Sequence, residues 1–379
     1  MNGRLGAPSQ RGSSESGSST GDYNPLFDSS PPSRWSGSEP EPSSKPAAPP
    51  AKPRHRKLRI AGVTALIVLL VLGMAAGSLY LSLQQFSSNI GRVPDVFSTL
   101  DEAERPSFSA DRESFLVMGT DSRNRAVQRS DDVLMLARMD VYMDANATRA
   151  SVVSIPRDSW VPIPEHGSNK IVAAYGYGGP SLLVLTVEKL TNVRIDHFVI
   201  IDFAGFQSMV DAVGGIDVTL NAATSSDGIQ FVRGVNHLDG RSALAYVSNG
   251  PADPAGYADR LTRQQTALRA LLERVASAGL LTEPVQLFRL LDALSAALRV
   301  DETLNNAAMQ QLALQMRGLH PKDVHFLVGP VKGLGREGGQ SVVYLDDARS
   351  TELWGALREG RVETYVQRYP DSLLPARPG

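Results

Sequence analysis

The sequence predicts an α/β protein: a mixed central β-sheet sandwiched by helices, preceded by one transmembrane helix and a disordered N-terminal tail. Two observations predict the folded part. From residue 113 onward, short and almost wholly apolar stretches alternate with longer helical ones, and strands that are apolar on both faces need helices over both. Long connections between paired stretches favour mixed over strictly parallel strand order.

The composition excludes several classes of function. The 38 Lys and Arg residues nearly balance the 40 Asp and Glu residues, which argues against a protein that binds nucleic acid through bulk charge. The chain contains no cysteine, which excludes a disulfide framework, a thiolate nucleophile and a cysteine-ligated zinc site. We therefore expect no nucleic-acid partner.

The N-terminal part divides into a tail, a basic run and an apolar segment. Residues 1–51 are rich in Ser, Gly and Pro and hold few aliphatic side chains, so we expect a disordered tail. Residues 52–59 are strongly basic, and no charged residue occurs between Ile60 and Gly91. A helix over residues 60–83 would be about 36 Å long, enough to cross a bilayer.

A buried soluble helix and a cleaved signal peptide are the alternatives for residues 60–83. A buried helix rarely lacks charge on every face for so long, and a signal peptide normally lies nearer the N-terminus. Because the basic run precedes the helix, the positive-inside rule places the tail in the cytoplasm and the remainder outside. We expect a single-pass protein of the cell membrane, with an extracytoplasmic stalk over residues 84–110.

The folded domain is expected over residues 111–362, with a C-terminal tail over residues 363–379. Short apolar runs, bounded by turn residues, predict strands at 114–120, 132–141, 150–155, 195–202, 215–220, 323–329 and 341–345. Longer segments with apolar residues three and four apart predict helices at 179–191, 203–215, 241–247, 258–279, 284–298, 303–318 and 347–360.

Polar side chains gather at the ends of these elements. In SVVSIPRDSW, Pro156 stops an apolar strand, and Arg157 and Asp158 follow at once. The whole set is Asp121, Arg125, Arg129, Asp131, Arg157, Asp158, Lys170, Arg260, Arg263 and Gln264. Carboxylate oxygens suit Mg²⁺ and arginines clamp phosphate oxygens, so the set is typical of a metal-bound diphosphate. Each residue taken alone is better explained as part of a turn, a cap, a surface ion pair or a solvated helix face, and only their joint occurrence favours a site.

Several of these motifs occur together in one known family. The segments FLVMGTDSR, RSDDVLMLARMD, VVSIPRDSWVPIP, DAVGGIDVTL, GVNHLDGRSALAYV and DRLTRQQ follow one another between residues 113 and 275, and GGQSVVYLD follows at 338–346. In this order they resemble the LytR-CpsA-Psr family of cell-envelope proteins. The resemblance implies an α-β-α domain of that type.

The resemblance also implies an activity: transfer of a glycopolymer from a polyprenyl diphosphate carrier to peptidoglycan through a phosphodiester, assisted by Mg²⁺ with Mn²⁺ as the alternative. It implies that Asp121 and Asp131 hold the metal. The implied catalytic residues are Arg129, Arg157, Asp158 and Arg260, and the implied substrate-binding residues are Arg125, Lys170, Arg263 and Gln264. Asp158 would either orient Arg157 or act as the base toward the acceptor hydroxyl. The helices at 179–191 and 203–213 would wall a pocket for the polyprenyl chain or simply form core.

One departure from the family pattern leaves other functions open. Ser248 and Gly250 stand where the family usually has two arginines, and each charge-assisted hydrogen bond contributes roughly 1.5–3 kcal/mol. The first alternative is therefore a catalytically weakened relative that binds polyprenyl-linked glycan or cell wall. The second is an envelope-linked transcriptional attenuator, against which the expected topology argues.

Overall fold

The computed structural model describes residues 90–109, 111–120, 133–142, 147–248, 254–277, 284–316 and 319–374. The expected tail, basic run and transmembrane segment at 60–83 lie outside these residues. Within the described ranges, no helix is both long and apolar enough to cross a membrane.

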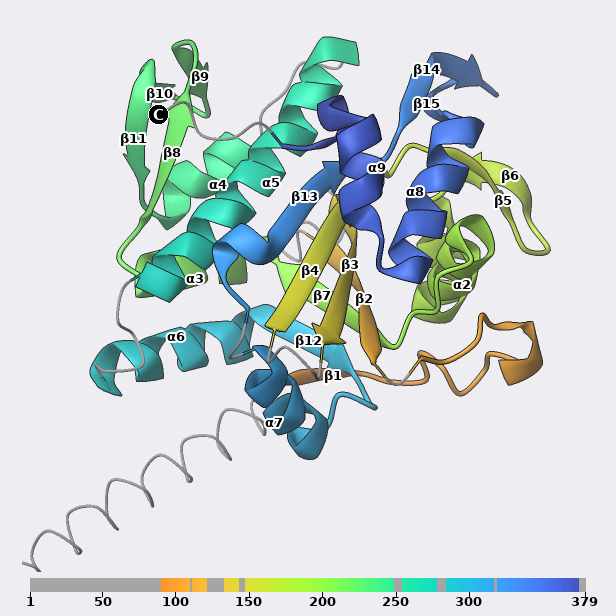
Figure 1. Cartoon of the computed structure of the whole chain (residues 1–379). Helices are drawn as coiled ribbons and strands as arrows, with labels where there is room; N and C mark the ends of the chain where they lie inside the picture. The colour runs from red at the N-terminus through yellow and green to blue at the C-terminus, as the bar shows by residue number, and fades with distance from the viewer. Residues whose placement is uncertain are drawn as a thin grey trace, which may run out of the picture. The chain divides into compact units, whose positions relative to one another are not determined.

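A seven-stranded mixed sheet forms the centre of the domain, as predicted (Figure 1). Its spatial order is β1 (Gly91–Val93), β12 (Leu298–Asp301), β7 (His197–Asp202), β2 (Arg112–Thr120), β3 (Val133–Tyr142), β4 (Ala147–Ser154) and β13 (Val324–Val328). The pairs β1–β12, β7–β2 and β4–β13 are parallel, and the remaining three pairs are antiparallel.

The strand directions bring the strand ends that adjoin the predicted polar residues to one edge of the sheet. Strands β7, β2, β4 and β13 run the same way, so their carboxyl ends share an edge, and β3 begins there. Gly119 of β2 pairs with Val133 of β3, and Met135 of β3 pairs with Ser154 of β4. The polar segments that follow β2, precede β3 and follow β4 in the sequence therefore all start from this edge.

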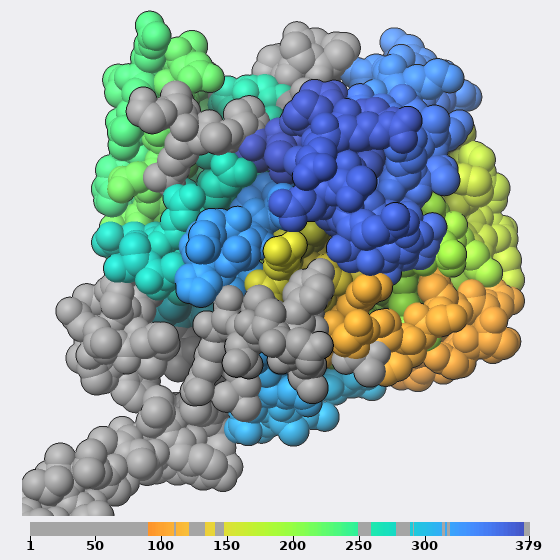
Figure 2. Space-filling model, viewed as in Figure 1, coloured from red at the N-terminus to blue at the C-terminus, as the bar shows by residue number. Residues whose placement is uncertain are grey.

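One face of the sheet is packed by α2 (Ala173–Thr191), α8 (Asp347–Glu359) and α9 (Val362–Arg368). Leu116 and Leu136 point from the strands into this layer and meet Leu183 of α2 and Leu353 of α8, all fully buried. Helices α8 and α9 form part of the surface seen in Figure 2, in dark blue. We call this the filled face, because its core is closed by side chains.

The other face carries α3 (Phe203–Ala212), α4 (Gly240–Ser248), α5 (Pro254–Ser277), α6 (Pro284–Ala297) and α7 (Asn306–Gln315). Figure 1 shows the sheet between these helices and those of the filled face. Helices α3 and α6 approach closely at Gly205, where an added Cβ would lie 2.3 Å from Ala297, so only glycine allows this contact.

Two of the predicted strands form outside the central sheet. The segment at 215–220 becomes β8 (Ile216–Leu220), which pairs with β11 (Gly234–Leu238), and 341–345 becomes β15 (Gln340–Leu345), which pairs with β14 (Val331–Glu337). Two further hairpins were not predicted: β5 (Trp160–Ile163) with β6 (Gly167–Lys170), and β9 (Thr224–Ser226) with β10 (Ile229–Phe231).

The folded unit extends beyond the expected bounds of 111–362 on both sides. In the segment expected to be a stalk, β1 forms the edge strand of the central sheet, and Ile90, Val93 and Val96 are buried. At the other end, the Leu374 N–H donates to the Phe326 carbonyl at 2.9 Å. A three-residue strand gives too short a pattern to be seen in sequence, so only its partner β12 reveals it.

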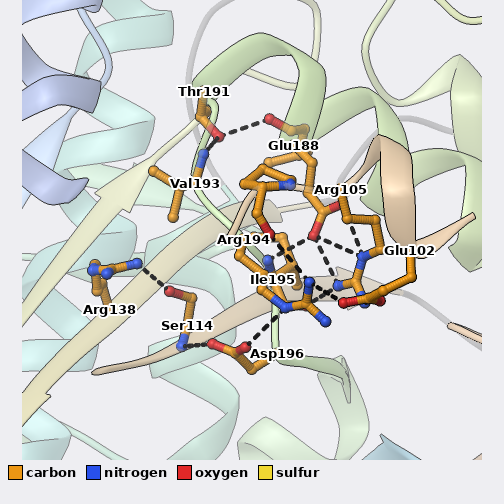
Figure 3. A network of polar contacts seen from close by, with 12 residues as sticks. Glu102, Arg105, Ser114, Arg138, Glu188, Thr191, Val193, Arg194, Ile195 and Asp196 are labelled. Carbon is orange, nitrogen blue, oxygen red and sulfur yellow. Dashed lines mark hydrogen bonds and ion pairs between the residues drawn. The ribbon is translucent and has the colours of Figure 1, made fainter. Parts of the chain in front are cut away.

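A buried ionic network ties the early segment to the filled face (Figure 3). Arg105 donates to both carboxylate oxygens of Glu188, at 2.8 to 3.3 Å, and to the Ile195 carbonyl. The Arg105 and Glu188 side chains are only 5% and 1% exposed. Because nearly every donor and acceptor of this pair has a partner inside the protein, we interpret it as structural.

Candidate active site

The turn after β4 is held by three separate parts of the chain. The Ser159 N–H donates to the Pro156 carbonyl at 2.9 Å, which closes the turn on itself. The Val172 N–H, just before α2, donates to the Arg157 carbonyl at 3.2 Å, and the Val343 N–H of β15 donates to the Asp158 carbonyl at 2.9 Å. The backbone of Arg157 and Asp158 is therefore rigid, which suits side chains that must be preorganised.

The side chains of this turn form a small half-buried cluster with Lys170. Asp158 lies between two cations: its Oδ1 is 2.8 Å from Lys170 Nζ and its Oδ2 is 3.4 Å from Arg157 Nε. The Arg157 guanidinium forms the ion pair with Asp158 but makes no hydrogen bond to any residue that the structure describes. Its side chain is 13% exposed, so its terminal nitrogens remain available to an anionic ligand.

Helix α5 is fixed to the same edge of the sheet by Gln265, which sequence analysis missed. Its side chain is fully buried, and its Nε2 donates to Ser154 Oγ at 3.0 Å and to the Leu327 carbonyl. These partners are the ends of β4 and β13. A signal existed: Gln265 takes a core position in the spacing of Leu261 and Leu268, where a lone amide needs a specific partner.

The three predicted residues of α5 do not share one environment. Gln264 lines an apolar cavity, and its Oε1 is buried with no hydrogen-bond partner among the described residues. Arg260, one turn earlier, lies on the same side of the helix. Arg263 instead lines a separate pocket of about 520 Å³, where it pairs with Asp259 and lies over the Tyr246 ring. Burial raises the pKa of the Tyr246 phenol, and Arg263 opposes that rise.

The apolar cavity lies between the sheet and the helices of the second face, and its volume is about 370 Å³. Successive side chains of β2 point to opposite faces of the sheet: Phe115 and Val117 face the cavity, whereas Leu116 faces the core of the filled face. The remaining lining comprises Gly119, Val133, Met135, Ala137, Arg138, Met139, Ala150, Val152, Ile201, Phe203, Phe206, Val247, Gln264, Leu268, Leu272, Leu312, Met316, Leu319 and Val324.

One end of the cavity reaches the edge of the sheet that carries Arg157. Gly119 lies at this end, and a Cβ there would come within 3.2 Å of both Phe203 and Val133, so a larger residue would narrow it. The expectation that the helix at 203–213 walls a pocket is confirmed by Phe203 and Phe206. For residues 179–191 the other alternative, core, is confirmed, because α2 covers the opposite face and its apolar side chains pack into the core there.

Four residues of the predicted site lie outside the described ranges: Asp121, Arg125, Arg129 and Asp131. Gly250, one of the two positions that depart from the family pattern, lies outside them as well. The structure does describe the residues on either side of them: Thr120 ends β2, Val133 begins β3 and Ser248 ends α4. Within the described ranges, no group of three or more His, Asp or Glu side chains could hold a metal ion. The described part of the site is thus the cationic cluster at Arg157, the Gln264 side of α5 and the apolar cavity.

Both the sequence and the fold of this chain resemble those of known proteins. The sequence profile of the LytR_cpsA_psr family matches residues 92–359, well over half of the chain. The chain belongs to the LytR-CpsA-Psr family. The match begins within β1, in agreement with a domain that starts before residue 111.

Individual relatives agree with this family assignment. The chain is 36% identical over 170 residues to a protein of Bacillus cereus named polyisoprenyl-teichoic acid–peptidoglycan teichoic acid transferase TagU, covering 45% of this chain and 54% of that one. The protein of the same name from Oceanobacillus iheyensis is 29% identical over 255 residues, with 63% and 77% covered. The chain thus spans about half the length of the first relative.

A solved structure shares the fold. The crystal structure of TagV from B. subtilis aligns with a TM-score of 0.54 at 27% sequence identity, covering 67% of this chain and 99% of that one. The mixed sheet with helices on both faces is therefore the fold of this LytR-CpsA-Psr family member.

Proposed function

We propose that this chain is a membrane-anchored phosphotransferase that moves a glycopolymer from a polyprenyl diphosphate carrier to peptidoglycan. The observation that carries the proposal is an apolar cavity that reaches the edge of the sheet from which a rigid cationic turn leaves. An isoprenoid tail needs a dry apolar wall, and a diphosphate needs cations and hydrogen-bond donors. The names of the TagU relatives, which state a polyisoprenyl-linked donor and a peptidoglycan acceptor, support it.

The proposed reaction is a displacement at phosphorus. The acceptor hydroxyl oxygen forms a bond to the phosphorus that carries the glycan, and the bond from that phosphorus to the bridging oxygen breaks. Polyprenyl monophosphate leaves with the bridging oxygen and its electron pair, and the hydroxyl proton passes to a base or to water. Such a transfer depends mainly on positioning and on neutralising charge.

The residues divide these tasks. We assign Arg157, Arg129 and Arg260 to the phosphate oxygens, and Lys170, Gln264 and Arg125 to the remaining donor contacts. Arg263 faces the second pocket and pairs with Asp259, so we assign it to bracing α5. Both oxygens of Asp158 face cations, which favours its role in orienting Arg157 over the role of base.

Asp121 and Asp131 are proposed to hold Mg²⁺, with Mn²⁺ as the alternative. Asp121 directly follows Thr120, the last residue of β2, and Asp131 precedes Val133, the first residue of β3, by two positions. These two strand ends are paired through Gly119 and Val133, and paired carboxylates are the donors a hard divalent ion prefers. A bound ion would neutralise charge on the diphosphate. Arg157, which follows the neighbouring strand β4, and Lys170 at the end of β6 would orient the same group.

A second candidate function is binding of the polyprenyl-linked glycan without turnover. Ser248 directly follows Val247, which lines the cavity, so the position that usually carries an arginine is next to the proposed lipid site. Losing two cationic contacts there would weaken transition-state stabilisation more than tail binding.

An envelope-linked transcriptional attenuator would require the folded domain inside the cell. Protease treatment of intact cells tests our placement outside the membrane, because a protected domain would contradict it.

Release of polyprenyl monophosphate by the full chain in vesicles tests the proposed function. With a polyprenyl diphosphate-linked glycan and Mg²⁺, we expect release by the wild-type chain and a loss of about 100-fold or more in Arg157→Ala and Asp131→Ala. Arg368→Ala, at an exposed position on α9, should not change the rate. Tail binding without any release supports the second candidate, and unchanged release in Arg157→Ala contradicts the assignment of this turn.

A further inference from the structure

Helix α7 is unusual for a surface helix because it carries no charged side chain. The stretch Leu304–Met316 contains only apolar residues, Asn and Gln. By contrast, α8 on the filled face carries charges at both ends and along its exposed side. Surface helices normally place charge on their solvent face. The exposed residues of α7, which include Gln310 and Gln311, could approach an apolar phase without stripping water from an ion.

The start of the described chain packs directly on α7. Ile90 is 4% exposed and belongs to one apolar cluster with Leu304, Met309 and Leu312. The predicted membrane helix ends at Leu83, seven residues before Ile90. Seven residues span at most about 25 Å even when fully extended. The end of the domain that carries α7 (Figure 1) is therefore tethered close to the bilayer surface.

The apolar cavity also opens to the surface at this end. Leu312, Met316 and Leu319 belong to its lining. Met316 is 41% exposed, and it is the only residue of the described lining that belongs to the exposed class. The apolar lining therefore continues from the interior to the surface beside α7, at the opposite end from Gly119 and the cationic turn.

We propose that α7 and Met316 rest on the outer surface of the lipid bilayer and form the portal through which the isoprenoid tail passes into the cavity. The tail would then leave the acyl-chain region and enter an apolar lining without crossing water, while its diphosphate reaches the opposite end of the cavity. The occupant of this surface is the phospholipid bilayer itself. The inference rests on the proposed function for the tail, whereas the contact of α7 with lipid rests only on the predicted membrane anchor and not on the transfer reaction.

A fluorescent probe can measure the contact directly, because the chain has no cysteine and single-cysteine variants label at one site. Met316→Cys and Val331→Cys are matched, since both side chains are 41% exposed in the wild type. Each full-length variant would carry the environment-sensitive dye NBD in vesicles of phosphatidylcholine and phosphatidylglycerol. We expect a blue-shifted emission at position 316 that lipids with spin labels on their acyl chains quench, and a water-like emission at 331. Equal emission and quenching at the two positions would overturn the proposal.

A second experiment separates the portal from the catalytic site. The double variant Gln310→Glu plus Gln311→Glu adds two charges to α7 outside the cavity lining, and Val331→Glu is the control. We expect the double variant to release polyprenyl monophosphate at least fivefold more slowly from a long-chain carrier embedded in vesicles, and at the wild-type rate from a short-chain carrier dissolved in water. Equal slowing with both carriers, or slowing with neither, contradicts the portal. If the wild type acts on neither carrier, the proposed function fails and the NBD comparison alone decides.

Discussion

The two faces of the central sheet are built from the same strands, yet they are packed differently. The filled face has a closed core, whereas the face under α3 to α7, which we call the hollow face, contains the cavity. Along β2, Leu116 enters a core closed by α2 and α8, whereas its neighbours Phe115 and Val117 border a cavity of about 370 Å³. Protein interiors normally close such spaces, because each void loses the contacts of its lining. A cavity that reaches the edge of the sheet carrying Arg157 is thus more easily explained by a ligand than by poor packing.

The charges differ between the faces as well. The filled face holds Arg105 with Glu188, which satisfy each other inside the protein. Arg157, at the edge of the sheet that the cavity reaches, has a rigid backbone, and within the described residues its side chain forms one ion pair, with Asp158. The difference teaches that burial and charge alone do not mark a site in this fold. What marks it is a cation that makes no hydrogen bond to any residue that the structure describes.

The largest expected effect on stability lies in the ionic pair of the filled face. Glu188→Gln would leave the buried Arg105 guanidinium with only the exposed Glu102 as a counter-charge, and breaking a buried pair typically costs about 3–5 kcal/mol. Glu352→Gln on α8 is the control, because its partner Arg368 is 67% exposed and surface pairs contribute about 1 kcal/mol or less. Urea unfolding measures both. Equal losses in the two variants would remove the distinction between a structural pair and a surface pair.

Shortening one leucine on each face should expose the difference in packing. Leu183→Ala on α2 removes a fully buried side chain from the filled core and should lower the free energy of unfolding by about 2–5 kcal/mol. Leu268→Ala on α5 should cost clearly less, since part of its surface already borders a void. Thermal and urea unfolding of the two variants provide the comparison. A larger loss for Leu268→Ala would mean that the cavity face is as tightly packed as the other.

Enlarging one alanine on each face reverses the test. Ala174→Leu forces a larger side chain into the filled core, where Ala174 is fully buried, and should cost about 1–3 kcal/mol. Ala137→Leu extends into the cavity and should leave the free energy of unfolding unchanged or slightly higher. Binding of a polyprenyl phosphate should weaken only in Ala137→Leu. Undiminished binding in that variant would contradict the cavity as the lipid site.

The smallest expected effect is a pH dependence from Asp196, beside the filled face. Burial raises the pKa of this carboxyl, and the hydrogen bond from the Ser114 N–H only partly opposes the rise. Because the folded pKa exceeds the unfolded one, the charged carboxylate destabilises the fold at neutral pH, and this cost disappears as the pH falls through the raised pKa. Asp196→Asn keeps an oxygen acceptor and should be slightly more stable at pH 7.

Unfolding at a series of pH values measures this difference. The advantage of Asp196→Asn should shrink steadily on acidification toward pH 4. An advantage that stays constant with pH would show that the Asp196 charge is not the cause. Asp371→Asn, which removes an exposed carboxylate paired with Arg349, serves as the control.

The sequence by itself determined the local structure and the family. Apolar runs and helical spacing predicted most of the central strands and the helices, because these patterns reflect which side chains a single element must bury. The break at Pro156 likewise predicted where β4 ends and where Arg157 begins, since proline cannot continue a strand. These are properties of neighbouring residues, and neighbours are what a sequence displays.

Only the tertiary structure decided which elements meet. It added β1 as an edge strand and β12 as its inner neighbour, and it moved β8 and β15 out of the sheet, because strand pairing joins segments far apart in the chain. It also separated Gln264 from Arg263 on the two sides of α5 and opened a cavity on one face of the sheet. A cavity is the space left between several packed elements, so no single stretch of residues can specify it.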